Sequence, residues 1–121
     1  MIKIGTDIIQ ISRIKHSIDK FGIKFLEKYL TDNEIKLINK VETAAGFWAA
    51  KEAVSKALEC GIGKDLAFKD IYIFKTKKGA PHFRLNKKIN LDIISSSLSI
   101  SHDGDFAIAV VAISISNKEK I

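Results

Sequence analysis

The feature that most restricts how this chain can fold is a stretch rich in small residues, "GFWAAKEAVSKALECGIG", from Gly46 to Gly63. Its apolar residues recur with the period of a helix, which we expect to run from about Glu42 to Cys60 and to stop at the glycines that follow. One broad face carries small or apolar side chains: Gly46, Phe47, Ala50, Ala53, Val54, Ala57 and Leu58. Because alanine and glycine let backbones approach, we expect this face to lie very close to a sheet.

The opposite face of this helix carries an acid and a base one turn apart, Glu52 and Lys56. An i,i+4 pair in this orientation stabilises an exposed helix by only about 0.2–0.5 kcal/mol. Considered alone, the spacing favours an ordinary surface ion pair. The alternative is that the helix brings both side chains into a cleft for chemistry, and the helical pattern leaves the choice open.

The remaining segments indicate an α+β fold. Before the long helix, "MIKIGTD" alternates as a short strand that ends near Asp7, Ser12 is placed to cap a helix, and "TDNE" is a capping-box pattern. After it, "FKDIYIFKT" and "HFRLN" are expected strands joined by a "KKGAP" turn, "INLDII" is a short helix or loop, and "SLSISHD" and "FAIAVVAISI" form a hairpin around Gly104. We therefore expect a single domain over residues 1–121, with the long small-residue-rich helix packed on a small, mainly antiparallel sheet.

Composition limits the cellular setting and the partners. The 121 residues include one cysteine, Cys60, which suits a reducing compartment, and we expect a cytoplasmic protein. Neither a run of about 18 apolar residues nor a secretory pattern in "MIKIGTDIIQ" is present, so no membrane span and no secretory leader are expected. The net charge of +6 favours an anionic partner, which leaves open nucleic acid, a phosphorylated small molecule and an acidic protein.

An ordered set of short motifs runs through the chain. The first strand carries "GTDII", with Gly5 and Asp7, and the long helix carries "FWAAKEAVSKAL", with Trp48, Glu52 and Lys56. The segments "GIG", "KDIYIF", "KKGAP" and "LSISHDGDFAIAVV" follow in that order. This set resembles the 4′-phosphopantetheinyl transferase family, and specifically its short holo-[acyl-carrier-protein] synthase group, over nearly the whole chain.

The resemblance implies a transferase that moves the 4′-phosphopantetheine arm of coenzyme A onto a serine of an apo acyl carrier protein, for fatty acid biosynthesis, and releases adenosine 3′,5′-bisphosphate. It implies three catalytic residues, Asp7, Glu52 and Lys56. By the resemblance Asp7 and Glu52 are ligands of Mg²⁺, a hard cation that also takes phosphate oxygens and water, although two carboxylates do not distinguish Mg²⁺ from Mn²⁺. Glu52 is then the candidate base for the serine proton, and Lys56 neutralises the pyrophosphate.

Coenzyme A is expected to contact further residues along the chain. The candidates are Lys51, Lys56, Gly61, Lys64, Pro81 and His102. The resemblance places the segment around His102 at the nucleotide end of coenzyme A, and the alternative is that this histidine caps the neighbouring turn. Asp7 also has an alternative, because a carboxylate just before "IIQIS" can cap the next helix.

The implied partners are an acidic acyl carrier protein and further copies of this chain. The first helix, "ISRIKHSIDKFGIK", brings Arg13, Lys20 and Lys24 into one region, where they are expected to dock the carrier protein through complementary charge. The length of the chain is similar to that of the family members that form trimers with intersubunit sites. In such a trimer the two metal ligands belong to one subunit, while His102 and the "KKGAP" region serve a neighbour's ligand.

Two positions depart from the family pattern. Phe47 stands where arginine is common, and Glu59 stands where glycine is common after "KAL". A lost phosphate contact and a carboxylate near a polyanionic ligand are the expected consequences, which Lys51 or Lys64 would offset. Two rival functions remain: a basic nucleic-acid-binding module, and a carrier-protein binder without catalytic activity.

Overall fold

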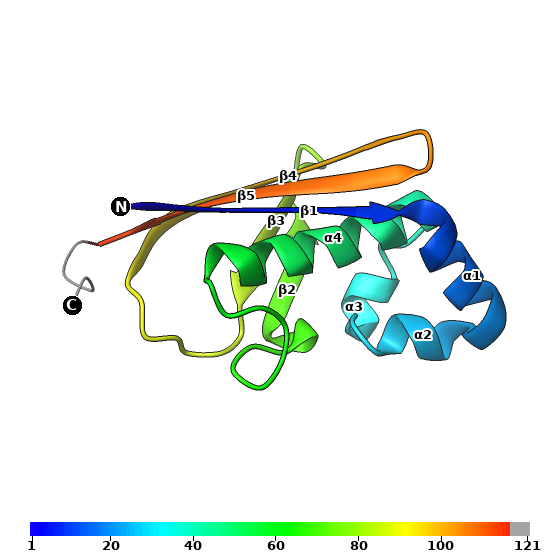
Figure 1. Ribbon diagram of the computed structural model, residues 1–121, viewed down its shortest axis with the longest axis horizontal. Helices are drawn as coiled ribbons and strands as arrows, with labels where there is room; N and C mark the ends of the chain where they lie inside the picture. The colour runs from blue at the N-terminus through cyan, green and yellow to red at the C-terminus, as the bar shows by residue number, and fades with distance from the viewer. Residues whose placement is uncertain (117–121) are drawn as a thin grey trace.

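The computed structural model describes residues 1–116 (Figure 1), so the predicted domain over 1–121 includes residues 117–121, which lie outside the described part. The helices are α1 (Ile11–Phe21), α2 (Ile23–Glu27), α3 (Asp32–Ile35), α4 (Val41–Ala57) and the 3₁₀ turn η1 (Phe68–Asp70). The strands are β1 (Ile2–Gln10), β2 (Ile71–Lys75), β3 (Pro81–Leu85), β4 (Ile93–Asp103) and β5 (Phe106–Ile115).

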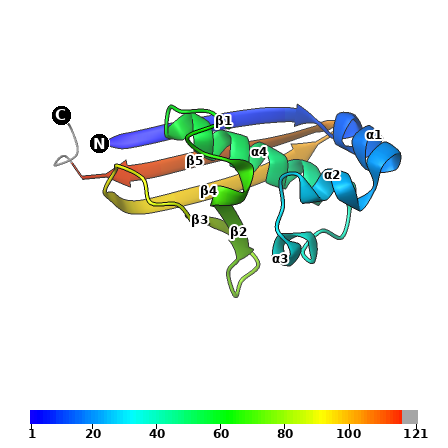
Figure 2. The ribbon, with the colours of Figure 1, turned by 90° about the horizontal axis from the view of Figure 1, so that it is seen from below.

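A three-stranded sheet of order β1-β5-β4 forms one layer, and α4 lies along one of its faces (Figures 1 and 2). Both pairings are antiparallel, and Ala109 of the central strand faces Asp7 on β1 and Ile100 on β4. The predicted terminal hairpin is confirmed, with Gly104 in its turn. The strands β2 and β3 form a separate antiparallel pair. The predicted α+β class, with a long small-residue-rich helix on a small antiparallel sheet, is therefore confirmed.

Glycine allows α4 to lie directly on β1. A Cβ atom added to Gly5 would lie 1.9 Å from the carbonyl oxygen of Ala53 and 2.6 Å from the amide nitrogen of Ala57. Such distances are far inside van der Waals contact, so no other residue fits at position 5 without moving the helix. The backbones of β1 and α4 are thus in contact. Side chains that project from one of these elements toward the other therefore lie close together.

The N-terminal strand and the helix after it differ from expectation. β1 continues past Asp7 to Gln10, because its pairing with β5 extends as far as Phe106. Ser12 does not cap a helix, since α1 already begins at Ile11. Its amide and hydroxyl groups instead donate hydrogen bonds to the two oxygens of Asp105, at 2.9 and 2.6 Å. These bonds hold the start of α1 against the β4–β5 turn.

The capping box is confirmed, whereas the end of the long helix is not. Thr31 and Glu34 exchange the two reciprocal bonds of a capping box at the start of α3. α4 ends at Ala57 rather than near Cys60, and Glu59 has a φ of 63°, in the left-handed region. A left-handed residue cannot continue a right-handed helix, so the chain turns away early.

Two boundaries in the second half of the chain also change. β2 begins at Ile71 rather than Phe68, because the 3₁₀ turn η1 comes first and Asp70 Oδ2 accepts a bond from the Ala67 amide at 2.8 Å. The segment 89–94, expected as a helix or a loop, is a loop that enters β4 at Ile93. On β2 and β3, Ile71, Ile73 and Phe83 reach the core.

The three-stranded sheet has one covered face and one open face. Side chains that point toward α4 are buried: Ala107, Ala109, Val111 and Ile113. Large apolar side chains on the other face are exposed, and they form what we term the outer sheet face: Ile2, Ile4, Ile8, Phe106, Ile108 and Val110. β5 is therefore covered on one side only within a single chain. Among residues 1–116, no helix combines the length and apolarity needed to cross a membrane.

Candidate active site

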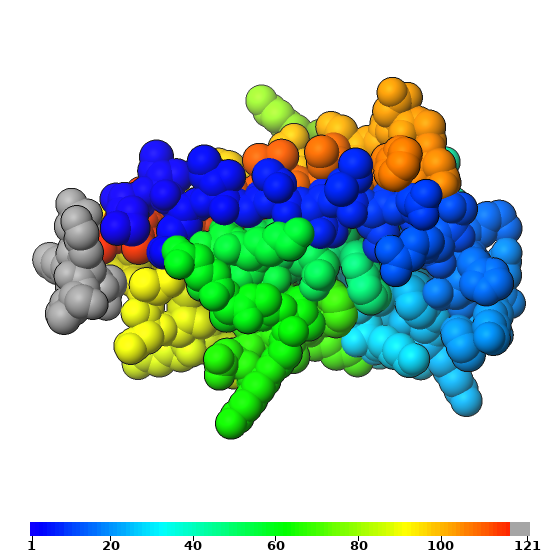
Figure 3. Space-filling model, viewed as in Figure 1, coloured from blue at the N-terminus to red at the C-terminus, as the bar shows by residue number. Residues whose placement is uncertain are grey.

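Asp7 projects from β1 toward α4. It lies two residues after Gly5, and alternate residues of a strand share a face, so its carboxylate is on the side that α4 covers. Lys56, in the last turn of α4, donates a hydrogen bond to Asp7 Oδ1 at 3.0 Å. The Asp7 side chain is 13% exposed and that of Lys56 is 54% exposed. In Figure 3 the atoms of β1 (blue) lie against those of the C-terminal half of α4 (green) at the surface of the molecule. The carboxylate is thus mostly covered, while the ammonium reaches solvent.

Glu52 lies one turn before Lys56 and completes the group. Partial burial raises the pKa of Glu52 above its usual value, and the nearby Asp7 carboxylate raises it further, while Lys56 acts in the opposite direction. Glu52 lies one turn from Lys56 on α4, and Lys56 bonds Asp7 on β1, so the three side chains belong to one region between β1 and α4. The ion pair found there joins Lys56 to Asp7, 49 positions away in sequence, so the simple i,i+4 surface pair does not describe these residues.

Neighbouring carboxylates that repel each other suit a divalent cation. A cation between Asp7 and Glu52 would remove the repulsion that contributes to the raised pKa of Glu52. In the described part of the chain, no cluster of three or more His, Cys, Asp or Glu side chains could hold a metal ion. The site therefore offers two carboxylates and leaves the other positions to phosphate oxygens and water, a donor set that fits Mg²⁺.

Lys51, predicted as a contact of coenzyme A, does not face this group. Its side chain is fully buried, and its ammonium donates to the carbonyl oxygen of Tyr29 at 2.7 Å and to Glu34 Oε1 at 2.9 Å. Burial lowers the pKa of Lys51, and the bond to Glu34 opposes that change. A lysine held in this way cannot offset a missing phosphate contact at Phe47.

Pro81 and His102 meet in a second region, a pocket of about 220 Å³ beside the N-terminal half of α4. Lys40 and Lys75 line the same pocket, although sequence reasoning missed both. Lys75 opens the "KTKK" cluster, and Lys40 comes directly before α4. These positions are ordinary for surface lysines, so only the fold reveals that they face a common pocket.

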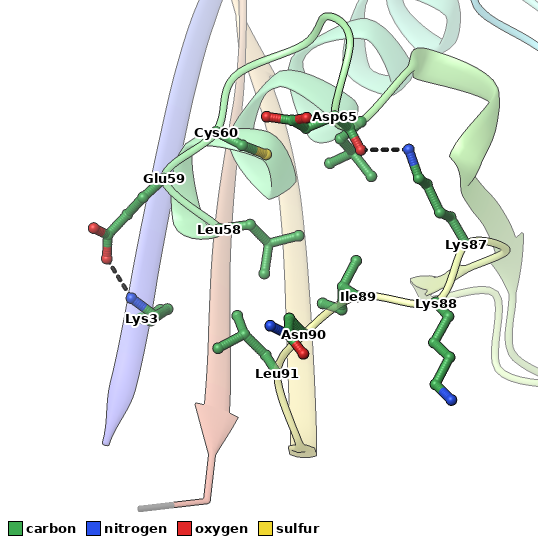
Figure 4. Close-up of a pocket in the computed structure, with 11 residues that line it drawn as sticks. Lys3, Leu58, Glu59, Cys60, Asp65, Lys87, Lys88, Ile89, Asn90 and Leu91 are labelled. Carbon is green, nitrogen blue, oxygen red and sulfur yellow. Dashed lines mark hydrogen bonds and ion pairs between the residues drawn. The ribbon is translucent and has the colours of Figure 1, made fainter. Parts of the chain in front are cut away.

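The two departures from the family pattern have physical explanations. Phe47 is buried and forms part of the wall of the pocket that Lys40, Glu42 and Lys75 also line, so the ammonium groups there are those of the two lysines. Glu59 occupies a left-handed backbone position, which favours glycine. Its carboxylate forms an ion pair with Lys3 (Figure 4), and that bond lowers the pKa of Glu59. The carboxylate is therefore directed to Lys3 on β1.

Gly61 and Lys64 belong to the loop after α4, beside a different cavity. This cavity is about 400 Å³ and is lined in part by Cys60, Asp65 and Lys87, with Lys87 donating to the Asp65 carbonyl oxygen at 2.7 Å (Figure 4). Gly61 has a φ of 67°, and Lys64 is exposed. Within the described part of one chain, neither residue lines the pocket that holds Pro81 and His102.

Basic and apolar side chains share the surface of α1 and α2. The three residues expected to dock a carrier protein are all exposed: Arg13, Lys20 and Lys24. Sequence reasoning missed two apolar side chains beside them, Phe21 and Ile23, which are 52% and 55% exposed. The ammonium groups of Lys20 and Lys28 lie 5.3 and 5.6 Å from the centre of the Phe21 ring. We refer to these residues, Arg13, Lys20, Phe21, Ile23, Lys24 and Lys28, as the basic-apolar surface.

Residues 3–111 match the family model described as "4'-phosphopantetheinyl transferase superfamily". A holo-[acyl-carrier-protein] synthase from Sulfurovum sp. (strain NBC37-1) is 56% identical over 114 residues, which cover 93% of this chain and 96% of that protein. The crystal structure of the Helicobacter pylori synthase in complex with coenzyme A has a TM-score of 0.83 at 48% identity and covers 92% of this chain and 99% of that one. The synthase from Bacillus anthracis, in complex with CoA (3',5'-ADP), has a TM-score of 0.78 at 38% identity, with 92% and 94% covered.

The chain therefore belongs to the 4′-phosphopantetheinyl transferase superfamily, and within it to the holo-[acyl-carrier-protein] synthases. The resemblance and the fold predicted from the sequence motifs are confirmed.

Proposed function

We propose that this chain transfers the 4′-phosphopantetheine arm of coenzyme A to a serine of an apo acyl carrier protein and releases adenosine 3′,5′-bisphosphate. The observation that carries the proposal is the convergence of Asp7, Glu52 and Lys56 from two elements of this fold. The co-substrate assigned here is the molecule bound in the structure of the Helicobacter pylori relative.

The three side chains have separate tasks in this reaction. The serine oxygen attacks the phosphorus that carries the pantetheine arm, and the bond from that phosphorus to the bridging oxygen breaks, so the electron pair leaves with adenosine bisphosphate. Glu52 accepts the hydroxyl proton, a task that its raised pKa suits. Lys56, with its ammonium exposed to solvent, neutralises the leaving phosphate. Asp7 and Glu52 would hold Mg²⁺, which when bound stabilises negative charge on the phosphate groups.

We propose that the nucleotide of coenzyme A occupies the pocket of Pro81 and His102 on a neighbouring copy of the chain. Asp7 lies on β1 and His102 lies on β4, and these are the two edge strands of the sheet. Within one chain, the charged group at Asp7 and the pocket of Pro81 and His102 are therefore two separate half-sites. The outer sheet face is apolar and open, which supports its being covered by another copy. A homotrimer with intersubunit sites satisfies both observations. Gly61 and Lys64 follow Lys56 and are proposed contacts from the first subunit.

The basic-apolar surface is the proposed docking site for the carrier protein. Its lysines and Arg13 suit an acidic partner, and charge complementarity of this kind speeds association and makes it sensitive to salt. Phe21, whose ring lies near the ammonium groups of Lys20 and Lys28, and Ile23 add exposed apolar area to this surface, and interfaces commonly combine apolar and charged contacts. We further propose that the reaction takes place in the cytoplasm and supplies fatty acid biosynthesis, in keeping with the family and with the single cysteine.

Intact-mass spectrometry tests the proposed function directly. An apo acyl carrier protein incubated with this chain, coenzyme A and Mg²⁺ is expected to gain the mass of one phosphopantetheine arm, and EDTA is expected to prevent the gain. A folded chain that binds the carrier protein yet adds no mass would show a binder without catalytic activity. Binding to nucleic acid without transfer would favour the binding-module alternative.

A further inference from the structure

One buried carboxylate, that of Glu34, connects three elements. Its Oε1 accepts hydrogen bonds from the Thr31 amide at 2.8 Å, from Thr31 Oγ1 at 3.2 Å and from Lys51 Nζ at 2.9 Å. Its Oε2 accepts from the Ile73 amide at 2.8 Å. The side chain has no exposed surface. The start of α3, the middle of α4 and the strand β2 therefore meet at this carboxylate.

Lys51 completes the junction from α4. Besides Glu34, its ammonium bonds the carbonyl oxygen of Tyr29, and the Tyr29 hydroxyl donates to the carbonyl oxygen of Ala44 at 2.9 Å. α4 is thus held at two levels, near its start and at its middle. Throughout residues 1–116, no buried side-chain nitrogen or oxygen lacks a hydrogen-bond partner. The junction is a fully satisfied polar network inside the core.

Stability alone does not account for a buried ion pair here. Apolar side chains of similar volume often serve as well or better, because both charges must lose their hydration. α4, however, has little division into polar and apolar faces. Its buried alanines lie on several sides: Ala44, Ala45, Ala49, Ala50, Ala53 and Ala57. Small side chains of this kind pack in more than one rotational setting of a helix, and a directional polar contact selects one setting.

We propose that Glu34 and Lys51 are positioning residues that set the rotation of α4 at which Glu52 faces Asp7. Successive residues on a helix point about 100° apart, so a fixed direction for Lys51 fixes the direction of Glu52. The bond from Ile73 to Glu34 extends the effect to β2, whose strand partner β3 begins with Pro81. The Glu34 carboxylate therefore bonds both the helix that carries Glu52 and the strand that pairs with β3 at Pro81. This proposal rests on the function proposed above for Asp7 and Glu52.

The test compares three variants of the full chain. Lys51→Met removes the charge and keeps the length of the side chain. Glu34→Gln with Lys51→Met removes both charges, so that no buried charge is left unpaired. Ile115→Ala is the matched control, because it creates a cavity at the end of β5, away from the proposed site. For each variant, thermal unfolding, Mn²⁺ affinity by electron paramagnetic resonance, and kcat and KM for transfer are measured.

We expect Lys51→Met and the double variant to bind Mn²⁺ more weakly and to lose roughly tenfold to a hundredfold in kcat, as a small displacement of a reacting group does. The double variant should recover most of the melting temperature and little of the Mn²⁺ affinity. Ile115→Ala should melt earlier, with Mn²⁺ affinity unchanged. KM for the carrier protein should change little, because no residue of the basic-apolar surface is replaced.

Wild-type Mn²⁺ affinity and kcat in the double variant would overturn the positioning role, as would an equal loss in Ile115→Ala. Should Lys51→Met fail to fold, the double variant alone decides. Absence of transfer by the wild-type chain would sink the proposed function instead. In that case Mn²⁺ binding would still test the positioning role, provided that Glu52→Gln abolishes this binding.

Discussion

Lys51 and Lys56 lie on the same helix, less than two turns apart, and have opposite environments. Lys51 has no exposed surface and holds two buried partners, whereas the side chain of Lys56 is 54% exposed and holds one carboxylate, that of Asp7. Both residues are lysines on one helix, so the difference in their roles comes from the residues around them. The lysine inside the core fixes structure, and the lysine at the rim remains available to a phosphate.

This contrast separates stability from chemistry. A buried pair that loses one partner leaves an uncompensated charge in the core, at a cost of about 3–5 kcal/mol. An exposed pair contributes roughly 0–1 kcal/mol. Changes on the rim side of α4 should therefore lower activity and barely affect unfolding, whereas changes on its core side should lower both the free energy of unfolding and activity.

The largest expected effect comes from Glu52→Gln. It removes the carboxylate proposed to hold the cation and accept the proton, so transfer should fall by about 10²–10⁴-fold. Because burial and Asp7 raise the pKa of Glu52, ionisation of this side chain costs more in the folded chain than in the unfolded chain, and the neutral glutamine should leave the free energy of unfolding unchanged or slightly higher. A time course by intact-mass spectrometry, with thermal unfolding alongside, measures both. Near-normal transfer would remove Glu52 from the mechanism.

The direct comparison uses Lys51→Met and Lys56→Met. The first should lower the free energy of unfolding by about 3–5 kcal/mol, and the second by less, because Lys56 reaches solvent and only one partner of its pair, Asp7, is mostly covered. Lys56→Met should nonetheless lose more transfer activity than its change in stability explains, because the leaving phosphate is no longer neutralised. Urea denaturation and initial rates on the two variants provide the measurement. Equal losses of stability would contradict the distinction between core and rim.

A pH experiment sharpens the description of the core side. Burial, and then the charge of Glu34, raise the pKa of Tyr29 above its ordinary value. Above about pH 10, Tyr29 loses its proton in the unfolded chain but keeps it in the folded chain. The contribution of Tyr29 to stability is therefore complete below that pH and is lost as the pH rises further. Tyr29→Phe should unfold with a shallower dependence on alkaline pH, although it loses the bond to Ala44. Urea denaturation at pH 9 and pH 11, with Tyr72→Phe as control, tests this, and parallel slopes for both variants would refute it.

The smallest expected effect concerns the ion pair after the helix, between Glu59 and Lys3. Position 59 has a left-handed φ, so Glu59→Gly should relieve strain where Glu59→Ala cannot. Both variants lose the exposed pair with Lys3. We expect the glycine variant to melt a few degrees above the alanine variant. The reverse order would show that the backbone at this position carries no strain worth relieving.

The sequence predicted the elements and the identity of the charged group better than their contacts. Asp7 and Glu52 were found through their motifs, and the capping box at Thr31 through its spacing. The burial of Lys51 was missed, because alanines on several sides of α4 hide which face is the core. The partner of Lys56 was missed because local spacing suggests Glu52, and only the pairing of β1 with β5 brings Asp7 alongside. The left-handed backbone at Glu59 was missed because a glutamate, unlike a glycine, does not indicate a positive φ.

The order of the strands has a consequence for how the chain is made. Within residues 1–116, β5 is the only strand that pairs with β1, and Asp7 faces Ala109 in that pairing. During synthesis Asp7 leaves the ribosome long before the strand that carries Ala109, its partner in the sheet. Contacts between such distant parts of a chain form late and slowly. A chain made only as far as Asp105 lacks the strand that pairs with β1, so we expect unfinished chains not to hold Asp7 against α4.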